Sequence, residues 1–163
     1  MKNKSVIIVC GDPKSTFNEI LIKTLKNRIF KNIKFPIIII GSKKVFKKEL
    51  KKLKVKVNLQ NFDNPENLSK KSIYNIDIPI DIKNFSLAKK NSYIEKSFKI
   101  ALNLLKKGNS VALINGPISK TTFLKGKYNG ITEFLAFKTR SHNEVMFLFN
   151  KELSVSPITT HIP

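Results

Sequence analysis

The sequence predicts an α/β domain whose mainly parallel sheet is flanked by helices. Apolar runs of strand length recur along the chain, at Ser5–Cys10, Phe35–Ile40 and Val111–Ile114. Between them lie longer segments whose apolar residues fall on one side of a helix. Strands that alternate with helices in this way are typical of parallel sheets. No linker, repeat or change of composition marks an internal boundary, so we interpret residues 1–163 as a single α/β segment.

The first predicted strand and the first predicted helix are separated by a short break. Gly11-Asp12-Pro13 ends the run Ser5–Cys10, and we interpret this tripeptide as a turn. The sequence Thr-Phe-Asn-Glu at 16–19 fits a capping box, in which the threonine and glutamate side chains satisfy amide groups at a helix start. The expected apolar stripe of this helix consists of Phe17, Ile20, Leu21, Leu25 and Ile29.

A second helix and two further strands are expected before residue 81. Ser42 is expected to cap a helix that buries Val45, Phe46, Leu50 and Leu53. Alternation over Val55–Leu59 predicts a strand covered on one face, and the polar stretch Asn61–Ser72 predicts a loop. Apolar residues also alternate from Ile76 to Ile80, but Pro79 favours an edge or irregular strand there.

A long helix and several strands are expected in the second half of the chain. Asn91 is the expected cap of a helix that ends near Lys107, with Gly108 as its stop signal. Its expected buried residues are Ile94, Phe98, Ala101, Leu102 and Leu105. The apolar run that follows, from Val111 to Ile114, predicts a strand buried on both faces. Later strands are expected at Val145–Phe149 and Pro157–Thr160.

Composition restricts the class of protein. The net charge is +20, but most of the positive charge is lysine spread over predicted solvent faces, so we expect no nucleic-acid partner. No apolar run is long enough to cross a bilayer, and no membrane partner is expected. The single cysteine, Cys10, cannot form an internal disulfide and is expected to be a buried strand residue. One cysteine and no membrane segment favour a cytoplasmic location.

The residue pattern most indicative of chemistry follows the third apolar run. Gly116-Pro117 turns the chain, and Ser119 is expected to cap the next helix. Lys120 would then lie where first-turn amide N–H groups point outward, and both favour an anionic group. Further along, Thr132 is expected to be the N-cap of another helix.

The carboxyl ends of parallel strands lie at one edge of a sheet, and ligands bind there. Gly11-Asp12, Gly116–Lys120 and His161 all follow apolar runs. We therefore expect these three places to converge on one edge.

Three short blocks in the last third of the chain carry a resemblance to a known family. They are Gly-Pro-Ile-Ser-Lys at 116–120, Gly-Ile-Thr-Glu-Phe-Leu at 130–135 and Thr-Thr-His-Ile-Pro at 159–163. In order and spacing they resemble the 4-hydroxythreonine-4-phosphate dehydrogenase family of pyridoxal phosphate biosynthesis. The resemblance implies an isocitrate-dehydrogenase-like fold with two domains, of which residues 1–163 are the N-terminal half. It also implies a homodimer in the full-length form.

The resemblance assigns roles to three residues and exposes one departure. His161 corresponds to a family metal ligand, and the implied divalent ion (Zn, Mg or Co) would polarise the hydroxyl being oxidised. Thr132 and Lys120 correspond to substrate-binding positions. The family histidine before the threonine is Ile131 here, which can neither donate, accept nor titrate. A further family block, Gly-Asp-Pro-x-Gly-x-Gly-Pro-Glu, has lost its glycine-rich character but matches at Gly11, Asp12, Pro13 and Glu19.

The implied reaction is the NAD-dependent oxidation and decarboxylation of 4-phosphooxy-L-threonine, a phosphorylated small molecule. The chain has no G-x-G-x-x-G motif, and the resemblance places most of the NAD site and the remaining metal ligands in the other half. Residues 1–163 alone are therefore expected to be inactive, and catalytic residues are not assigned. Two alternatives stay open. One is an enzyme of the same fold acting on a different phosphorylated hydroxy acid, because Ile131 removes a polar contact. The other is a non-catalytic basic binding module.

Overall fold

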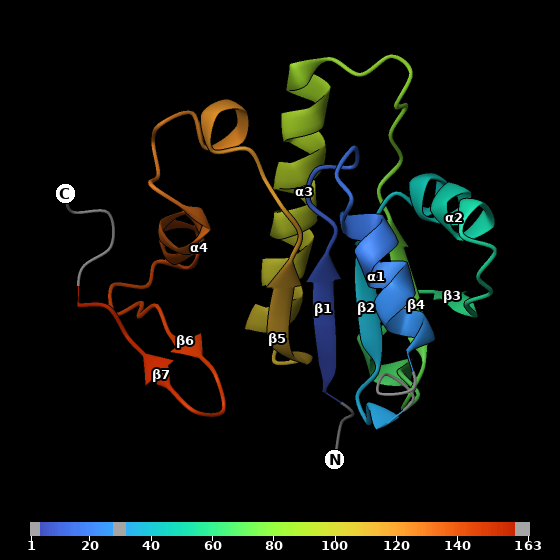
Figure 1. Ribbon diagram of the computed structural model, residues 1–163, viewed down its shortest axis with the longest axis horizontal. Coiled ribbons are helices and arrows are strands. Elements are labelled where there is room, and N and C mark those ends of the chain that lie inside the picture. Colours follow the sequence, from blue (N-terminus) through green and yellow to red (C-terminus); the bar gives the residue numbers. More distant parts are fainter. Residues whose placement is uncertain (1–3, 28–31, 159–163) are drawn as a thin grey trace. The chain divides into compact units, whose positions relative to one another are not determined.

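The chain divides into two compact units, residues 1–118 and 119–163. The structure, a computed structural model, describes residues 4–27 and 32–158 (Figure 1). The boundary falls directly after the turn that ends the last strand of unit 1. The residues around it do not have the composition of a linker.

Unit 1 is built on a five-stranded parallel sheet with the strand order β3-β4-β2-β1-β5 (Figure 1). The strands are β1 (Ser5–Val9), β2 (Ile37–Gly41), β3 (Leu59–Asn61), β4 (Ile73–Asp77) and β5 (Ser110–Asn115). Every pairing in this sheet is parallel. The predicted fold class, a mainly parallel sheet flanked by helices, is confirmed.

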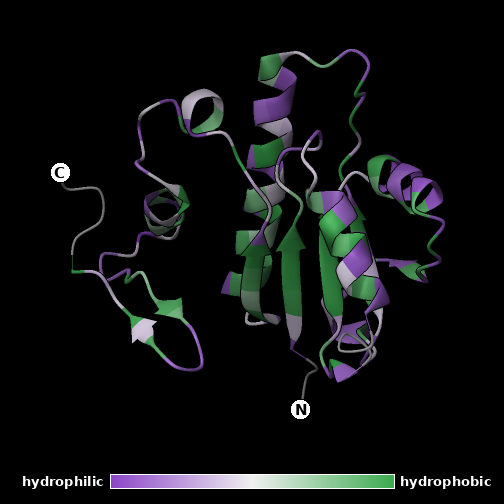
Figure 2. Ribbon diagram, viewed as in Figure 1, coloured by the Kyte–Doolittle hydropathy of each residue, from purple (hydrophilic) through white to green (hydrophobic). Residues whose placement is uncertain are grey.

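Helices cover both faces of the central strands. Helices α1 (Phe17–Lys26) and α2 (Lys43–Lys52) lie on one face, and α3 (Leu87–Lys106) lies on the other (Figure 1). Successive strand side chains point to opposite faces, so β1 sends Ile8 toward α1 and Ile7 toward α3. Both faces of β1 and β2 are therefore apolar, as Figure 2 shows, and this is what a parallel sheet between two helix layers requires.

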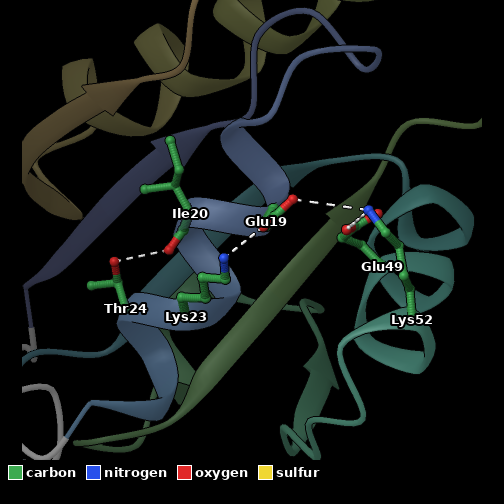
Figure 3. Close-up of polar contacts among 6 residues, drawn as sticks. All are labelled: Glu19, Ile20, Lys23, Thr24, Glu49 and Lys52. Atoms are coloured by element: carbon green, nitrogen blue, oxygen red, sulfur yellow. Dashed lines mark hydrogen bonds and ion pairs between the residues drawn. The ribbon is translucent and has the colours of Figure 1, made fainter.

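Helix α1 begins at the predicted residue but without the predicted capping box. Thr16 has a helical backbone, with φ −72° and ψ −1°, and its side chain makes no capping hydrogen bond. Glu19 instead accepts a hydrogen bond from Lys23 at 2.6 Å, and this bond lowers the pKa of Glu19 (Figure 3). Lys52 of α2 lies 3.0 Å from Glu49 and 3.9 Å from Glu19, so the charges bridge the two helices. These pairs are exposed and add little stability.

The predicted apolar stripe of α1 is only partly buried. Leu21 and Leu25 are buried as expected, whereas Ile20 is 56% exposed and Ile22, outside the stripe, is fully buried. Ile29 lies outside the described residues. The helix is therefore rotated relative to the predicted stripe and leaves one large apolar side chain in solvent.

Helices α2 and α3 are close to their predicted positions. The Ser42 hydroxyl accepts a hydrogen bond from the Val45 amide and caps α2 as predicted, although only Phe46 of the expected core residues is fully buried. Helix α3 begins earlier than predicted, because Ser86 rather than Asn91 is its N-cap. Its expected core residues Ile94, Phe98 and Ala101 are buried, and Leu104 joins them in place of Leu102 and Leu105.

Two strands differ from their predicted extents. Strand β4 ends at Asp77, before Pro79, and lies between β3 and β2 rather than at an edge. Pro79 lies beyond the end of β4, so it does not prevent the strand from pairing on both sides. Strand β3 is only three residues long, although Val55 and Val57 before it are half-buried against the core as their alternation predicted.

The predicted burial of β5 on both faces is wrong. Within the part of the chain that the structure describes, β5 is the last strand of the sheet and pairs only with β1, and Val111 and Ile114 are 49% and 50% exposed. An apolar run reveals that a strand is hydrophobic but does not reveal its place in the strand order. That place is set by which other strands the chain brings beside it.

Unit 2 is small and only lightly packed. It contains a short π-helix (Lys120–Leu124), α4 (Ile131–Thr139) and an antiparallel pair of strands, β6 (Leu148–Phe149) and β7 (Ser154–Val155). Phe134 is buried between the rings of Phe123 and Tyr128, at centroid distances of 5.3 and 5.5 Å. Strand β6 falls within the expected Val145–Phe149 strand. The strand expected at Pro157–Thr160 is not formed at 157 and 158, and its other residues lie outside the described part of the chain.

No helix among the described residues of either unit has the length and apolarity needed to cross a membrane.

Cys10 is expected to resist alkylation in the folded protein. It follows β1 directly, is buried as predicted, and desolvation raises the pKa of its thiol from 9.0 to about 12. The reactive thiolate is therefore scarce, and iodoacetamide at mildly alkaline pH should label Cys10 only after urea is added, as measured by intact mass.

The same pKa shift predicts how stability depends on pH. The unfolded chain loses the thiol proton first as the pH rises, so the contribution of Cys10 to stability should decline above about pH 9. Labelling of the folded chain at the rate of a free thiol would contradict both expectations.

Candidate functional site

Two turns meet at the carboxyl edge of the sheet in unit 1. The Asp12 amide donates a hydrogen bond to the Pro117 carbonyl at 2.9 Å, and the Gly116 amide donates one to the Val9 carbonyl at 2.7 Å. A Cβ atom on Gly11 would lie 2.4 Å from the Pro117 oxygen, and one on Gly116 would lie 2.3 Å from the Cys10 oxygen. The expected convergence is thus confirmed for these two turns, and glycine is needed because two backbones cross in contact.

An ion pair between Asp12 and Lys90 fixes the first of these turns to α3. The Lys90 ammonium lies 3.0 Å from Asp12 Oδ2, and the two side chains are only 18% and 21% exposed. The other carboxylate oxygen accepts a hydrogen bond from the Lys14 amide at 3.0 Å. The Lys14 ammonium lies 5.2 Å from the centre of the Phe85 ring. Both oxygens of Asp12 are therefore used to hold the turn, which agrees with its interpretation as a turn.

Removal of the Asp12–Lys90 pair is expected to be costly only when one partner is left behind. Replacing Lys90 with methionine leaves a partly buried carboxylate without its cation, and we expect a loss of about 1–2 kcal/mol in the free energy of unfolding. The double variant Asp12→Asn/Lys90→Met should lose less than the sum of the single variants, measured by urea denaturation. Additive losses would show that the two side chains do not interact.

Lys120 begins the short π-helix of unit 2. The Ser119 hydroxyl accepts a hydrogen bond from the Thr122 amide at 3.1 Å, so the predicted cap is confirmed. The helix itself is only five residues long, and Lys125, which caps its C-terminal end, has a φ of 51°. The Lys120 side chain is exposed, so its ammonium group is accessible to an anionic ligand.

Thr132 lies in the first turn of α4 and not at its cap. Gly130 is the N-cap and Ile131 is already helical, so the predicted N-cap role of Thr132 is wrong. Thr132 instead lines a pocket of about 380 Å³ within unit 2. The other lining residues are Glu133, Glu144, Val145, Met146, Ser156, Pro157 and Ile158.

The two carboxylates in this pocket were not singled out by the sequence analysis. Glu133 follows Thr132 directly in the second block, so its position in the block was the available signal. Glu144 follows no motif, and only the fold brings it to the same pocket. The lining combines a hydroxyl, two carboxylates and several apolar side chains, which suits a polar molecule that carries a cationic group.

The proposed metal ligand, His161, lies outside the described residues. Within 4–27 and 32–158, no group of three or more His, Cys, Asp or Glu side chains is placed to hold a metal ion. The other histidine of the chain, His142, is exposed. The described residues therefore do not form a metal centre by themselves.

The fold and these sites define an α/β protein with a parallel sheet between helix layers, tight glycine turns at its carboxyl edge and a polar pocket beside Thr132. Residues 33–163 match the family model described as pyridoxal phosphate biosynthetic protein PdxA. The chain belongs to this family.

Relatives and solved structures agree with this assignment. The chain is 34% identical over 96% of its length to a 4-hydroxythreonine-4-phosphate dehydrogenase of Sulfurihydrogenibium sp., and 29% identical over 99% to one of Aquifex aeolicus. It covers 49% and 51% of those two proteins. A crystal structure of 4-hydroxythreonine-4-phosphate dehydrogenase from Klebsiella pneumoniae superposes with a TM-score of 0.80 at 26% identity, covering 98% of this chain and 52% of that one. The chain spans about half the length of the curated relatives it matches.

Proposed function

We propose that the chain forms the first half of a dehydrogenase that oxidises 4-phosphooxy-L-threonine with NAD and decarboxylates the product, in pyridoxal phosphate biosynthesis. The observation that carries the proposal is the family match over 33–163, which includes all three sequence blocks. The names of the Sulfurihydrogenibium and Aquifex relatives support the same reaction. A cytoplasmic homodimer of the full-length form belongs to the proposal.

The pocket of unit 2 supports a division of roles for the substrate. We assign the Thr132 hydroxyl to hydrogen bonding with the substrate, and the exposed Lys120 ammonium to its phosphate. Glu144, in the same pocket as Thr132, suits the α-ammonium group of an amino acid. The pocket lining is acidic, so the phosphate must be met by lysine side chains rather than by the pocket itself.

A divalent metal ion (Zn, Mg or Co) would supply charge to stabilise the oxygen of the substrate during oxidation. His161 is its proposed ligand from this chain. Since the described residues offer no ligand set, the other ligands are expected in the second half of the protein, together with most of the NAD site.

The test is NADH formation from 4-phosphooxy-L-threonine in the presence of a divalent metal. Residues 1–163 should be joined to the second half of the Sulfurihydrogenibium relative, and the joined protein compared with the 163-residue chain. We expect turnover by the joined protein and none by the chain alone. A folded joined protein that forms no NADH would contradict the proposed reaction. Turnover by the chain alone would overturn the expectation that it is an incomplete half.

A second candidate substrate is D-threonate 4-phosphate. A relative from Oceanobacillus iheyensis, 31% identical over 99% of this chain, is provisionally named a D-threonate 4-phosphate dehydrogenase. Ile131 favours a changed substrate because it cannot make the polar contact of the family histidine. D-threonate carries a hydroxyl where threonine carries an ammonium, so Glu144 distinguishes the two. In the joined protein, Glu144→Gln should weaken only the reaction of the amino acid, by about tenfold in kcat/KM.

The Ile131→His variant of the joined protein gives the complementary measurement. If the family histidine contacts 4-phosphooxy-L-threonine, the variant should have a higher kcat/KM for that compound than the unsubstituted joined protein. The kcat/KM for D-threonate 4-phosphate is measured beside it. A basic binding module, the remaining alternative, would instead show nucleic-acid affinity that falls steeply with salt.

A further inference from the structure

Two neighbouring strands of the sheet in unit 1 send the chain to opposite faces. Strands β2 and β4 pair in parallel and end side by side, with Gly41 opposite Asp77. The chain then passes from β2 into α2 on one face, and from β4 through residues 78–86 into α3 on the other (Figure 1). Parallel sheets bind ligands in the crevice that such a divergence opens beyond the carboxyl ends of the strands. A ligand site is therefore expected between these two connections.

A pocket lies between the two connections. At their base the Ile78 amide donates a hydrogen bond to the Gly41 carbonyl at 3.2 Å, and the Lys43 amide donates one to Asp77 Oδ1 at 2.8 Å. The pocket has a volume of about 210 Å³ and is formed by one turn of α2 and by the loop after β4. Its lining residues are Lys44, Val45, Lys48, Ile80, Asp81, Ile82 and Lys83. The pocket thus lies where the topology of the sheet predicts one.

The charge of this pocket is positive, since three lysines and one aspartate line it. Among the described residues, none of the ammonium groups of Lys44, Lys48 and Lys83 has an ion-pair or hydrogen-bond partner. One carboxylate oxygen of Asp81 accepts a hydrogen bond from the Lys83 amide at 3.0 Å, so this carboxylate holds the loop closed. Three ammonium groups without counter-ions favour an anion that carries more than one charge.

The remaining lining of the pocket is apolar. Val45, Ile80 and Ile82 are half-buried and form a hydrophobic wall. A bare inorganic anion would leave this wall in water, whereas a ligand with an apolar body would cover it and gain free energy with the area buried. Pockets that enclose drug-sized ligands begin at about 300 Å³, so the ligand of this pocket is a small molecule.

We propose that this pocket, which we call the lysine pocket, binds a small phosphate monoester with an apolar body. A phosphate monoester carries close to two negative charges at neutral pH and offers three acceptor oxygens. Its charge matches the excess of lysine over aspartate, and its body covers the apolar wall. The lysine pocket shares no lining residue with the pocket beside Thr132. Its ligand can therefore be tested separately from the proposed reaction.

The probe is pyridoxine 5′-phosphate, a phosphate monoester on a pyridine ring that has no aldehyde and so forms no imine with lysine. Its binding to the 163-residue chain is measured by calorimetry at physiological ionic strength. We expect saturable binding at one site with a Kd below about 1 mM. Inorganic phosphate and pyridoxine each lack one of the two features and should bind at least about tenfold more weakly. No saturable binding of the probe, or equal binding of either part alone, overturns the proposal.

Two double variants of α2 separate the lysine pocket from the general charge of the helix. Lys44→Gln/Lys48→Gln removes two ammonium groups from the pocket and should weaken binding of the probe about tenfold or more. Lys47→Gln/Lys51→Gln removes the same charge from exposed positions outside the lining and should change the Kd by less than about twofold, because salt screens distant charges. Equal weakening by the two variants would show that the probe follows the charge of the helix, and it overturns the proposal.

The last measurement uses the chain joined to the second half of the Sulfurihydrogenibium relative. The joined protein should bind the probe as the chain alone does, and Lys44→Gln/Lys48→Gln should weaken that binding by the same factor. Loss of binding, or binding that this variant does not weaken, would show that the lysine pocket is covered in the longer protein and overturns the proposal. Since no turnover is needed, an inactive joined protein that still binds the probe at this pocket contradicts only the proposed reaction.

Discussion

Replacing Gly116 with alanine is expected to destabilise unit 1 by about 3 kcal/mol or more in the free energy of unfolding. The new Cβ would lie 2.3 Å from the Cys10 carbonyl oxygen and 2.8 Å from Phe17 Cδ1. The nearest of these atoms belongs to the backbone, so the turn after β5 would have to move away from β1. The pairing of the two strands and the start of α1 would both be disturbed. Urea denaturation monitored by circular dichroism measures the loss.

Gly108→Ala is the matched control for this substitution. Gly108 has a φ of 72°, and a Cβ there would meet no atom within 4 Å. Its replacement therefore costs only the left-handed backbone conformation, about 1–2 kcal/mol. If Gly116→Ala costs no more than Gly108→Ala, the two turns at the sheet edge do not cross as closely as the structure has them.

The Thr132→Val variant of the joined dehydrogenase is expected to lose about 100-fold in kcat/KM. Valine keeps the shape of threonine but removes the hydroxyl that we assign to the substrate. When the Thr132 hydroxyl is removed, the substrate group that it would bind is left in the site without a hydrogen-bond partner. The loss in kcat/KM is therefore large. The melting temperature should change little, because Thr132 is only half-buried and does not cap α4.

Thr139→Val is the control, since Thr139 ends the same helix and lies outside the pocket. Its hydroxyl donates to the Leu135 carbonyl, so the variant reports any general effect on α4. Equal kinetic losses for the two variants would assign the effect of Thr132 to the helix and remove it from the substrate site.

The sheet of unit 1 was predictable because its strands are continuous apolar runs. Apart from Ser5, the strands Ser5–Val9 and Ile37–Gly41 contain no polar side chain that would favour exposure to water. They are therefore suited to burial between two helix layers. The start of α2 was predictable for a local reason, since Ser42 needs only the Val45 amide three residues away. The capping box of α1 was not, although the helix begins at the predicted residue, because the Glu19 carboxylate pairs with Lys23 and Lys52 instead.

The candidate site was predictable only where a motif named its residues. Thr132 and Lys120 were identified from their blocks, whereas Glu144 reaches the pocket of Thr132 through the path of the chain after α4. No spacing in the sequence indicates that contact. The capping role expected of Thr132 failed because Gly130 permits the extended backbone that a cap requires, and the helix begins directly after it.

The sequence by itself determined the class of fold, the family and the two turns that meet at the sheet edge, because apolar runs, glycines and short motifs act through neighbouring residues. The tertiary structure alone decided that β5 lies at the edge of the sheet formed by the described residues and that Ile20 faces solvent. Burial depends on what lies beside a residue in space, and hydrophobicity along the chain does not specify which neighbour that will be.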